Sequence, residues 1–334
     1  MKNILIDVAI QKEKLDYLRS LPGVHVEVVD FTDEQKAHPK EILKDKQILF
    51  CLTPPLNFEE LDSLEFIQLT SAGYSQLFGL GLTEKGIRAA NGQGVSDIAI
   101  AEWSMAMMVN LIRDLRGMIR NQESRIWDCN ARYQKEIYGS TLGIWGYGSI
   151  GRETARLAKA MGMKVHVLSR KVAPQPAMPE FYHIPGTGDP DAVLPDAVFA
   201  PGQETDFLKD LDFLVLTMPL TNNTKGIVGE KELRSLPRTA FLLNPARGPI
   251  IVEEALLKAL REGWIAGAAI DTHFYYPMPA DHPLWCFPNV IFTPHIAGIS
   301  VNERIWDIFI QNVERILADK PLINELTAAK LRGE

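Results

Sequence analysis

A glycine-rich turn near the middle of the chain constrains the fold more than any other feature. The motif Gly146-Tyr-Gly-Ser-Ile-Gly151 directly follows the apolar run at residues 142–145 and precedes an amphipathic segment. A strand, such a turn and a helix in this order let the backbone approach a pyrophosphate and aim a helix N-terminus at the anion. The sequence therefore favours a dinucleotide-binding turn over a glycine turn without a ligand. The residues expected at the cofactor are Gly146, Gly148, Ser149, Ile150 and Gly151.

Short apolar runs alternate with amphipathic segments on both sides of this turn. The runs that read as strands lie at 4–8, 25–29, 47–52, 66–70, 87–90, 142–145, 165–168, 213–217, 240–243, 266–270 and 290–292. Strands separated by helices form parallel sheets with helices on both faces. We therefore expect an α/β protein with two doubly wound parallel-sheet domains, a flavodoxin-like substrate domain and a Rossmann cofactor domain.

Two helical patterns set the expected domain boundaries. Residues 96–115 begin with a Ser-Asp pair suited to helix capping and carry an apolar stripe, so they predict one long helix. A second helical pattern near the C-terminus is expected to pack back on the first domain. We therefore expect residues 1–100 with 300–334 to form the substrate domain and residues 101–299 to form the dinucleotide-binding domain.

Composition excludes several classes of partner. Among 334 residues, 35 Lys and Arg stand against 42 Asp and Glu, and this net charge of −7 argues against nucleic-acid or anionic-membrane binding. Cys51, Cys129 and Cys286 show no CxxC spacing, which argues against a disulfide framework and a structural metal site. Neither the N-terminal apolar run nor residues 98–112 resembles a signal or membrane segment. A cytoplasmic location is the expectation.

The end of the next strand bears on the choice of cofactor. An NAD-binding protein usually carries Asp or Glu there, to accept bonds from the ribose 2′-hydroxyl. This chain has Ser169, Arg170 and Lys171 instead, two cations and a hydroxyl that suit a 2′-phosphate. The sequence therefore favours NADPH/NADP, with NADH/NAD as the second option. A solvated basic turn without a cofactor role is the alternative.

Three polar residues follow the last three apolar runs. Arg247, Asp271 and His295 should meet at the carboxyl edge of one parallel sheet. Hydride transfer to a carbonyl needs a cation to hold the electrophile and a proton donor near neutral pH, which arginine and histidine supply. Alone, His295 would equally suit a buried structural histidine. In company with Arg247 and the glycine turn, it is a candidate catalytic residue.

Four sequence blocks resemble the D-isomer-specific 2-hydroxyacid dehydrogenase family, in matching order along nearly the whole chain. They are Gly146-Tyr-Gly-Ser-Ile-Gly151, Leu216-Thr-Met-Pro-Leu-Thr221, Asn244-Pro-Ala-Arg-Gly248 with residues 253–260, and Thr293-Pro-His295. The resemblance implies that Arg247 binds the carboxylate and carbonyl oxygens of the substrate and that His295 exchanges the proton. It also implies that Asp271 contacts the nicotinamide carboxamide and that Pro219 lines the cofactor cleft.

The resemblance extends to a loop in the first half of the chain. Ser71-Ala-Gly-Tyr74 is similar to the family's glycine loop, so Ala72, Gly73 and Tyr74 are expected to hold the substrate carboxylate. That assignment puts the substrate between the two domains, where Tyr74, Trp285 and residues 52–54 would sense its side chain. Members of the family are commonly homodimers, which makes residues 115–127 a candidate subunit contact.

Two features depart from the family pattern. Tyr276 stands where the family normally carries a glutamate that hydrogen-bonds the catalytic histidine. A phenol is neutral below about pH 10 and favours imidazolium far less than a carboxylate does. Either Asp281 replaces that glutamate or Tyr276 packs in its place. Residues 172–204, rich in Pro and Gly, predict a long irregular excursion that could form a flap near the adenosine.

The expected function is an NADP(H)-preferring reductase of small 2-oxo acids that yields D-2-hydroxy acids, similar to glyoxylate/hydroxypyruvate reductases. The alternative is a non-catalytic dinucleotide-binding or interaction protein on the same fold, since fold alone does not imply turnover. The presence of Arg247 and His295 together favours the enzyme. The sequence does not identify which 2-oxo acid is the substrate.

Overall fold

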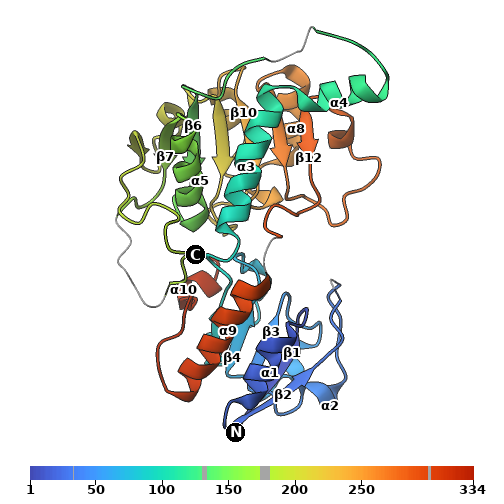
Figure 1. The fold of residues 1–334 in the computed structure, drawn as a ribbon, viewed down its shortest axis with the longest axis vertical. Helices are drawn as coiled ribbons and strands as arrows, with labels where there is room; N and C mark the ends of the chain where they lie inside the picture. The colour runs from blue at the N-terminus through green and yellow to red at the C-terminus, as the bar shows by residue number, and fades with distance from the viewer. Residues whose placement is uncertain (33, 130–133, 174–180, 300–301) are drawn as a thin grey trace. The chain divides into compact units, whose positions relative to one another are not determined.

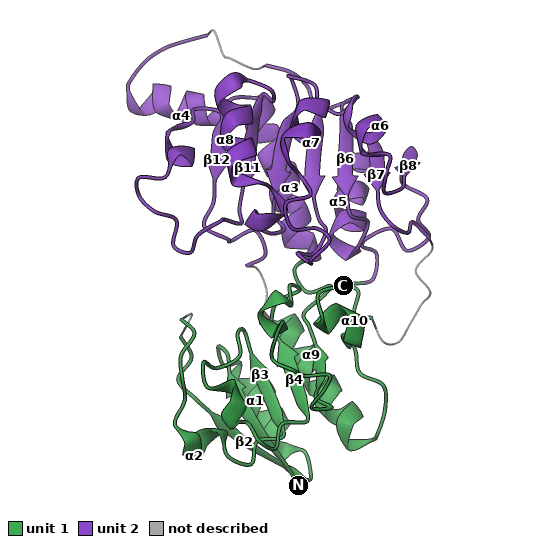
Figure 2. Cartoon of the chain, turned by 180° about the vertical axis from the view of Figure 1, so that it is seen from behind, with its two compact units in different colours: residues 1–96, 177–184, 300–334 green, residues 97–176, 185–299 purple. Residues whose placement is uncertain are grey.

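The computed structural model describes residues 1–32, 34–129, 134–173, 181–299 and 302–334. The chain divides into two compact units. Unit 1 comprises residues 1–96, 177–184 and 300–334, and unit 2 comprises residues 97–176 and 185–299 (Figure 2). The described residues 181–184 thus belong to unit 1, whereas the sequence assigned them to the dinucleotide-binding domain.

Unit 1 contains a five-stranded parallel sheet in the order β2-β1-β3-β4-β5 (Figure 1). Its register places Ile4 beside Val26 on one side and Ile48 on the other. The strands are β1 (Lys2–Asp7), β2 (Val24–Val28), β3 (Ile48–Cys51), β4 (Phe66–Leu69) and β5 (Arg88–Ala90). The helices are α1 (Lys12–Ser20), α2 (Lys40–Leu43), α9 (Asn302–Leu317) and α10 (Ala328–Leu331), with short 3₁₀ turns at Phe58–Glu60 and Ser75–Leu77.

Aromatic packing holds the C-terminal helix α9 in unit 1. Phe50 of β3 stacks on Phe309 with ring centroids 4.2 Å apart and meets the edge of Trp306 at 5.2 Å. All three side chains are fully buried. Large aromatic rings remove much apolar surface from water, so this contact explains why the chain returns to the first sheet.

Unit 2 contains a seven-stranded parallel sheet in the order β12-β11-β10-β9-β6-β7-β8. The strands are β6 (Thr141–Trp145), β7 (Lys164–Leu168), β8 (Ala197–Phe199), β9 (Phe213–Leu216), β10 (Phe241–Asn244), β11 (Gly267–Ile270) and β12 (Val290–Phe292). The helices are α3 (Asp97–Ile112), α4 (Leu115–Glu123), α5 (Ser149–Ala160), α6 (Glu204–Leu208), α7 (Glu230–Ser235) and α8 (Glu253–Glu262), with 3₁₀ turns at Gly248–Ile250 and Pro283–Cys286.

Helices cover both faces of this second sheet. Helices α3 and α5 pack on the face nearer the viewer in Figure 1, through Met105, Met108 and Ala155. Helices α7 and α8 pack on the opposite face, through Leu233 and Leu256. Strands buried on both faces read as continuous apolar runs, which is why the sequence locates them.

The predicted irregular excursion at residues 172–204 is partly wrong. Within it, β8 adds a seventh strand, parallel to β7, and α6 begins at Glu204. Strand β8 consists of Ala197, Val198 and Phe199, an apolar run too short to stand out in this Pro- and Gly-rich stretch, and it lies at the edge of the sheet. Residues 174–180 of the excursion lie outside the described part of the chain.

The helix predicted over residues 96–115 is α3, which ends earlier, at Ile112, and a separate helix, α4, begins at Leu115. Asp114 adopts a left-handed conformation with φ 48° between α3 and α4. Its carboxylate accepts the backbone N–H of Gly117 at 3.3 Å and so caps α4. None of the helices in the described ranges combines the length and the apolar character that crossing a membrane requires.

Candidate active site

The predicted cofactor and catalytic residues of unit 2 follow the carboxyl ends of its parallel strands. Gly146 follows β6, Pro219 lies beyond β9, Arg247 lies beyond β10, Asp271 follows β11 and the stretch that bears His295 follows β12. Parallel strands end at a common sheet edge, where ligands of doubly wound proteins bind. The fold therefore collects these residues at one edge, as their sequence positions indicate.

The three glycines of the turn meet different surroundings. At Gly146, where φ is 106°, a Cβ atom would lie 2.8 Å from the backbone nitrogen of Met218, and at Gly151 it would lie 2.4 Å from the Gly146 carbonyl oxygen. At Gly148 a Cβ atom would have no described neighbour within 4 Å. The first and third glycines thus allow close packing of the turn, and the second leaves its outer side open to a ligand.

Helix α5 begins at this turn with Gly148 as its N-cap, and no side chain caps it. The first N–H groups of a helix lack partners within the helix and favour an anion. Ser149 directs its hydroxyl to Asp97 at 3.1 Å. The open side of Gly148 and the helix N-terminus fit the pyrophosphate of a dinucleotide cofactor.

Ser169, Arg170 and Lys171 follow directly after β7. The N–H of Ser169 donates to the Phe199 carbonyl oxygen of β8, which fixes the start of this segment. The Ser169 hydroxyl donates to the Lys171 carbonyl oxygen at 3.3 Å, and the residues Arg170 and Lys171 are exposed. Both cations are therefore accessible to a ligand.

Arg247 lies in a turn that Asn244 shapes. The Asn244 side chain donates to the Arg247 carbonyl oxygen at 2.9 Å and accepts the N–H of Ala246 at 3.1 Å. At Gly248 a Cβ atom would lie 2.2 Å from the His273 carbonyl oxygen, so only glycine fits after the arginine. Burial lowers the pKa of the Arg247 guanidinium from its usual value. An arginine so placed stays cationic and can bind a carboxylate through two parallel hydrogen bonds.

Asp271 holds the loop that carries His295. Its carboxylate accepts the Thr293 hydroxyl at 2.6 Å, the N–H of Ile296 at 2.8 Å and the N–H of Ala297 at 3.0 Å. Its backbone carbonyl accepts the N–H of His295 at 2.8 Å. Asp271 is buried, and His295 adopts a left-handed conformation with φ 58°. The aspartate thus positions the histidine, a role that sequence reasoning missed because most of the partners are backbone groups.

His295 remains exposed, yet its surroundings disfavour its charged form. Loss of water around the ring and the positive charge of Arg247 lower the pKa of His295, although Asp271 acts in the opposite direction. A histidine pKa below its usual value of about 6.5 leaves the neutral imidazole dominant at neutral pH. His295 is therefore mostly neutral at neutral pH, and only a small fraction of it is imidazolium that can donate a proton.

Tyr276 faces the histidine with its ring. The ring centroids of Tyr276 and His295 lie 5.5 Å apart at an interplanar angle of 51°. The Tyr276 hydroxyl oxygen accepts the backbone N–H of His273 at 3.0 Å. Burial raises the pKa of Tyr276, so the phenol stays neutral. Asp281 is exposed and is not among the charges that shift the pKa of His295.

His273 is a further polar residue of the site that sequence reasoning missed. It is buried, stacks on Phe292 with centroids 4.0 Å apart, and shares a hydrogen bond of 2.7 Å between its Nε2 and the Thr293 carbonyl oxygen. Burial lowers the pKa of His273. The sequence signal that could have found His273 is its position two residues after Asp271. Through these contacts, His273 joins the segments that follow β11 and β12, next to the loop that carries His295.

The loop Ser71-Ala-Gly-Tyr74 lies in unit 1, where its carbonyl oxygens are fixed. Asn91 donates to the Ala72 carbonyl oxygen at 2.6 Å, and the Ser71 hydroxyl donates to the Gly73 carbonyl oxygen at 2.7 Å. Tyr74 is buried and meets the edge of Phe78 at 6.0 Å. Its predicted role toward a carboxylate stays a prediction.

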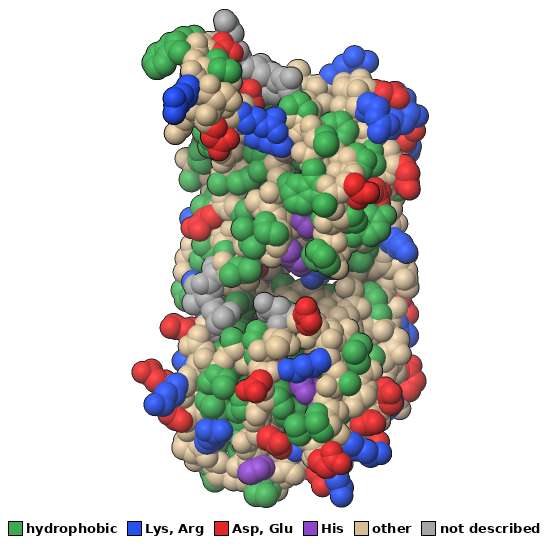
Figure 3. Space-filling view, turned by 90° about the vertical axis from the view of Figure 1, so that its right-hand side faces the viewer, with side chains coloured by type: hydrophobic (Ala, Val, Ile, Leu, Met, Phe, Trp, Pro, Cys, Tyr) green, Lys and Arg blue, Asp and Glu red, His purple; other side chains and the backbone are tan. Residues whose placement is uncertain are grey.

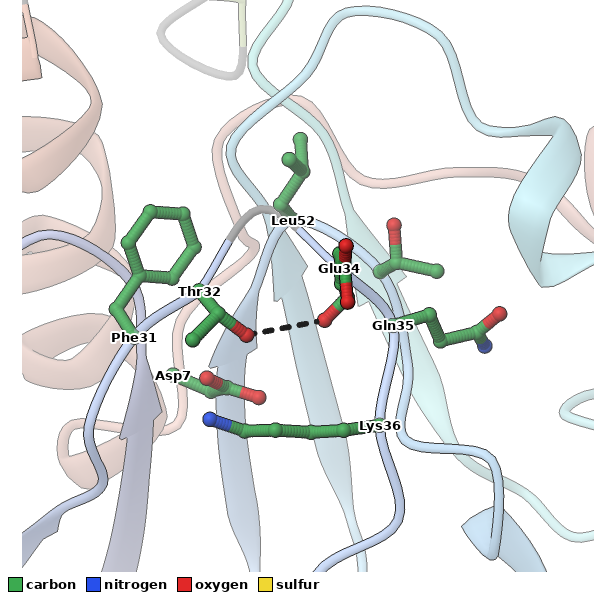
Figure 4. Close-up of a pocket in the computed structure, with 8 residues that line it drawn as sticks. Asp7, Phe31, Thr32, Glu34, Gln35, Lys36 and Leu52 are labelled. Atoms are coloured by element: carbon green, nitrogen blue, oxygen red, sulfur yellow. Dashed lines mark hydrogen bonds between the residues drawn. The ribbon is translucent and has the colours of Figure 1, made fainter. Parts of the chain in front are cut away.

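Unit 1 also holds a small cavity of about 20 Å³ at the carboxyl ends of β1 and β3 (Figure 4). Its lining includes Asp7, whose carboxylate lies 2.8 Å from Nε2 of the buried His38, and Leu52 of the predicted side-chain sensor. Among the lining residues, the Thr32 hydroxyl donates to the Glu34 carbonyl oxygen at 3.2 Å (Figure 4). A cavity of this size accommodates about one water molecule.

Within the described ranges, no three or more histidine, cysteine, aspartate or glutamate side chains lie close enough together to bind one metal ion.

Comparisons with known proteins agree with this geometry. Residues 105–297 match the family model "D-isomer specific 2-hydroxyacid dehydrogenase, NAD binding domain". A glyoxylate reductase of Thermofilum pendens is 32% identical over 270 residues, which cover 78% of this chain and 75% of that protein. A glyoxylate reductase of Thermococcus gammatolerans is 31% identical over 316 residues, covering 90% and 88%.

A solved structure shows the same architecture. A D-isomer specific 2-hydroxyacid dehydrogenase family protein from Aeromonas salmonicida superposes with a TM-score of 0.80 at 26% identity, covering 98% of this chain and 99% of that one. The family model and the relatives extend over the glycine turn, Arg247 and Asp271. The chain therefore belongs to the D-isomer specific 2-hydroxyacid dehydrogenase family, as an enzyme that interconverts 2-oxo and 2-hydroxy acids with a nicotinamide cofactor.

Proposed function

We propose that this enzyme reduces small 2-oxo acids to D-2-hydroxy acids and that it prefers NADPH. The observation that carries the proposal is the placement of Arg247 beyond β10 and of His295 after β12, at the carboxyl edge of the second sheet. A cation and a proton carrier at this edge match the needs of carbonyl reduction. A protein that only binds the dinucleotide has no chemical use for both.

Each residue has a separate task in the proposed reaction. The Arg247 guanidinium holds the carboxylate and polarises the carbonyl oxygen, and His295 delivers the proton to that oxygen. A bound reduced nicotinamide supplies the hydride. Asp271 and Tyr276 act on the reaction through His295, which they contact. Ala72, Gly73 and Tyr74 are proposed to contribute to carboxylate binding, and Pro219, which is exposed after β9, to line the cofactor cleft.

A small substrate is the proposed class. Both relatives compared above are glyoxylate reductases. Glyoxylate and hydroxypyruvate share the carboxylate beside a carbonyl that Arg247 can hold at two points. The size of the substrate side chain is proposed to be sensed by Tyr74, Trp285 and residues 52–54.

The preference for NADPH is proposed from the segment after β7. Arg170 and Lys171 are exposed, and Ser169 occupies the position where an acid would bind the ribose hydroxyls of NADH. A guanidinium binds a phosphate through charge-assisted hydrogen bonds that a 2′-hydroxyl cannot match. NADH remains the weaker cofactor.

A homodimer is proposed on the apolar surface of α4 and the segment after it. This helix has no buried residue, and its side chains include Leu115, Met118 and Ile119, which are 42%, 39% and 46% exposed. Trp127, four residues beyond α4, is 95% exposed. Figure 3 shows apolar side chains at the upper end of unit 2, which contains α4. Replacement of Trp127 and Ile119 by serine should raise the fraction of monomer in light scattering.

The decisive experiment measures loss of the reduced-nicotinamide absorbance with glyoxylate, hydroxypyruvate and bulkier 2-oxo acids, using NADPH and NADH in parallel. We expect the small acids to be turned over. At low cofactor concentration the rate should be higher with NADPH than with NADH, and chiral chromatography should show a product of D configuration. If NADPH binds but no 2-oxo acid is reduced with either cofactor, the protein is the non-catalytic dinucleotide-binding alternative.

A further inference from the structure

The tyrosine inside the glycine turn makes a buried contact with the excursion after β7. The Tyr147 hydroxyl donates to Oδ2 of Asp189 at 2.5 Å, and the two residues are only 4% and 3% exposed. Burial and this carboxylate raise the pKa of Tyr147, so the phenol stays protonated as a donor. The turn itself requires glycines and not this side chain, which leaves the tyrosine to be explained.

Asp189 is itself fixed by its own loop. Its Oδ1 accepts the N–H of Val193 at 3.1 Å, and its Oδ2 also accepts the N–H of Leu194 at 3.1 Å. A buried carboxylate needs such donors to offset its lost hydration. The bond from Tyr147 therefore attaches the glycine turn to a rigid acceptor.

Arg152 adds a second attachment in the first turns of α5. Its guanidinium lies 4.8 Å from the Tyr147 ring centroid and donates to the Asp189 carbonyl oxygen. Through Nη2 it also donates to the Ala173 carbonyl oxygen at 2.8 Å. Ala173 lies two residues after Lys171, so one buried side chain joins the glycine turn to the segment of the proposed 2′-phosphate site.

The next residue strengthens the same connection. Glu153 is fully buried, accepts the N–H of Gly188 at 2.6 Å and pairs with Arg156 at 2.6 Å. Successive side chains of α5 thus hold the loop around Asp189 from two sides. Arg152 makes its hydrogen bonds through Nη1 and Nη2, while its buried Nε has no partner among the described residues.

We propose that Tyr147, Arg152 and Asp189 form a brace that fixes the pyrophosphate-binding turn and the 169–173 segment in one mutual arrangement. The inference rests on the proposed function, because it assigns the brace to the NADP(H) site of that enzyme. The three are positioning residues: they act through the backbone of the turn and the segment. Their removal should change cofactor affinity before it changes the chemical step.

Two variants separate the two ends of the brace. Tyr147→Phe removes only the bond to Asp189, and it should weaken NADPH and NADH equally, by about threefold to tenfold, the usual loss for one hydrogen bond. Arg152→Met keeps a long apolar side chain but releases Ala173, so it should weaken NADPH more than NADH. The kcat at saturating cofactor should stay within about twofold of the parent, because the reacting groups are unchanged.

The measurement is the dissociation constant of each cofactor by nicotinamide fluorescence, with thermal unfolding recorded for every variant. Tyr138→Phe, at a tyrosine that is 75% exposed, and Asp191→Asn, at an exposed aspartate near Asp189, are matched controls. Neither control should change either dissociation constant.

The outcomes distinguish the brace from the function beneath it. Weaker cofactor binding in a variant that is still fully folded at the temperature of the titration supports the brace. Unchanged dissociation constants in Tyr147→Phe, with or without a lower unfolding temperature, overturn it and leave the proposed function standing. If the parent protein binds neither cofactor, the proposed function fails, and the brace fails with it. Should Arg152→Met not fold, the result for Tyr147→Phe alone decides.

Discussion

Asp271 holds His295 in a left-handed backbone conformation by accepting its N–H at 2.8 Å, while the aspartate carboxylate accepts the next two backbone N–H groups. One buried acid thereby fixes the position of the candidate proton carrier. The family resemblance assigns Asp271 to the nicotinamide, and the observed hydrogen bonds give it a structural task as well. A catalytic group that is already held in position lowers the entropic cost of orienting it when the substrate reacts.

We expect Asp271→Asn to lower both stability and turnover. The amide offers one acceptor oxygen, and its NH₂ group would face a backbone donor. Such a mismatch should cost about 1–3 kcal/mol of unfolding free energy, because a buried donor loses its acceptor. Chemical denaturation and steady-state kinetics measure the two effects. Asp281→Asn, at an exposed carboxylate, is the control, and an equal loss in that variant would contradict the assignment.

His295→Asn should slow the chemical step by about 10²–10⁴-fold, the typical contribution of a general acid. Asparagine tolerates the left-handed conformation at this position better than alanine does, so the loop should keep its shape. Stopped-flow measurement of a single turnover prevents product release from masking the effect. An unchanged rate of hydride transfer would exclude the histidine as proton donor.

Arg247→Ala should abolish measurable turnover while leaving the dissociation constant of NADPH nearly unchanged, because the guanidinium is assigned to the substrate. Loss of a charged hydrogen-bonding group commonly costs about 2–5 kcal/mol when its partner is buried. Arg238→Ala, at an exposed arginine, serves as the control. Equal loss of NADPH affinity and turnover in Arg247→Ala would move the arginine to the cofactor site.

Arg170→Ala should weaken NADPH far more than NADH, by about 1.5–3 kcal/mol, the size of a charge-assisted hydrogen bond. Fluorescence titration with both cofactors gives the difference directly. Lys164→Ala removes an exposed cation at the start of the same strand and should leave the cofactor preference intact. Tighter binding of NADH than NADPH to the unmutated protein would defeat the prediction.

The parts of the fold that could be predicted from sequence are those that bury both faces of a strand. Runs such as residues 213–217 and 240–243 contain almost continuous apolar residues because β9 and β10 lie in the middle of the sheet. Strand β8 could not be found in this way, since it is short and lies at an edge. The assignment of Tyr182 to unit 1 also had no local signal in the sequence, because its N–H donates to the side chain of Asn324, far away along the chain.

The same limit applies to the site. Strand ends and the glycine motif located Gly146, Arg247 and His295, because their positions follow from the order of apolar runs. The bonds of Asp271 to backbone N–H groups and of Tyr147 to Asp189 depend on loop geometry. No spacing rule records such contacts, so only the folded chain reveals them.

Tyr276 provides the test of how protonation is controlled. The pKa of His295 is lowered by loss of water and by Arg247, so reduction, which needs imidazolium, should fall as pH rises through a value below about 6.5. In Tyr276→Glu a negative charge lies beside the imidazole and should raise that pKa. The descending limb of the pH–rate profile for 2-oxo acid reduction should then move to higher pH.

Tyr276→Phe is the matched control for this prediction. The phenol is neutral, so its hydroxyl contributes no charge, and the limb should stay close to that of the parent. If Tyr276→Glu leaves the limb in place while Asp281→Asn moves it to lower pH, then Asp281 is the working partner of the histidine. In that case Tyr276 serves only as a packed wall beside the His295 ring, 5.5 Å away.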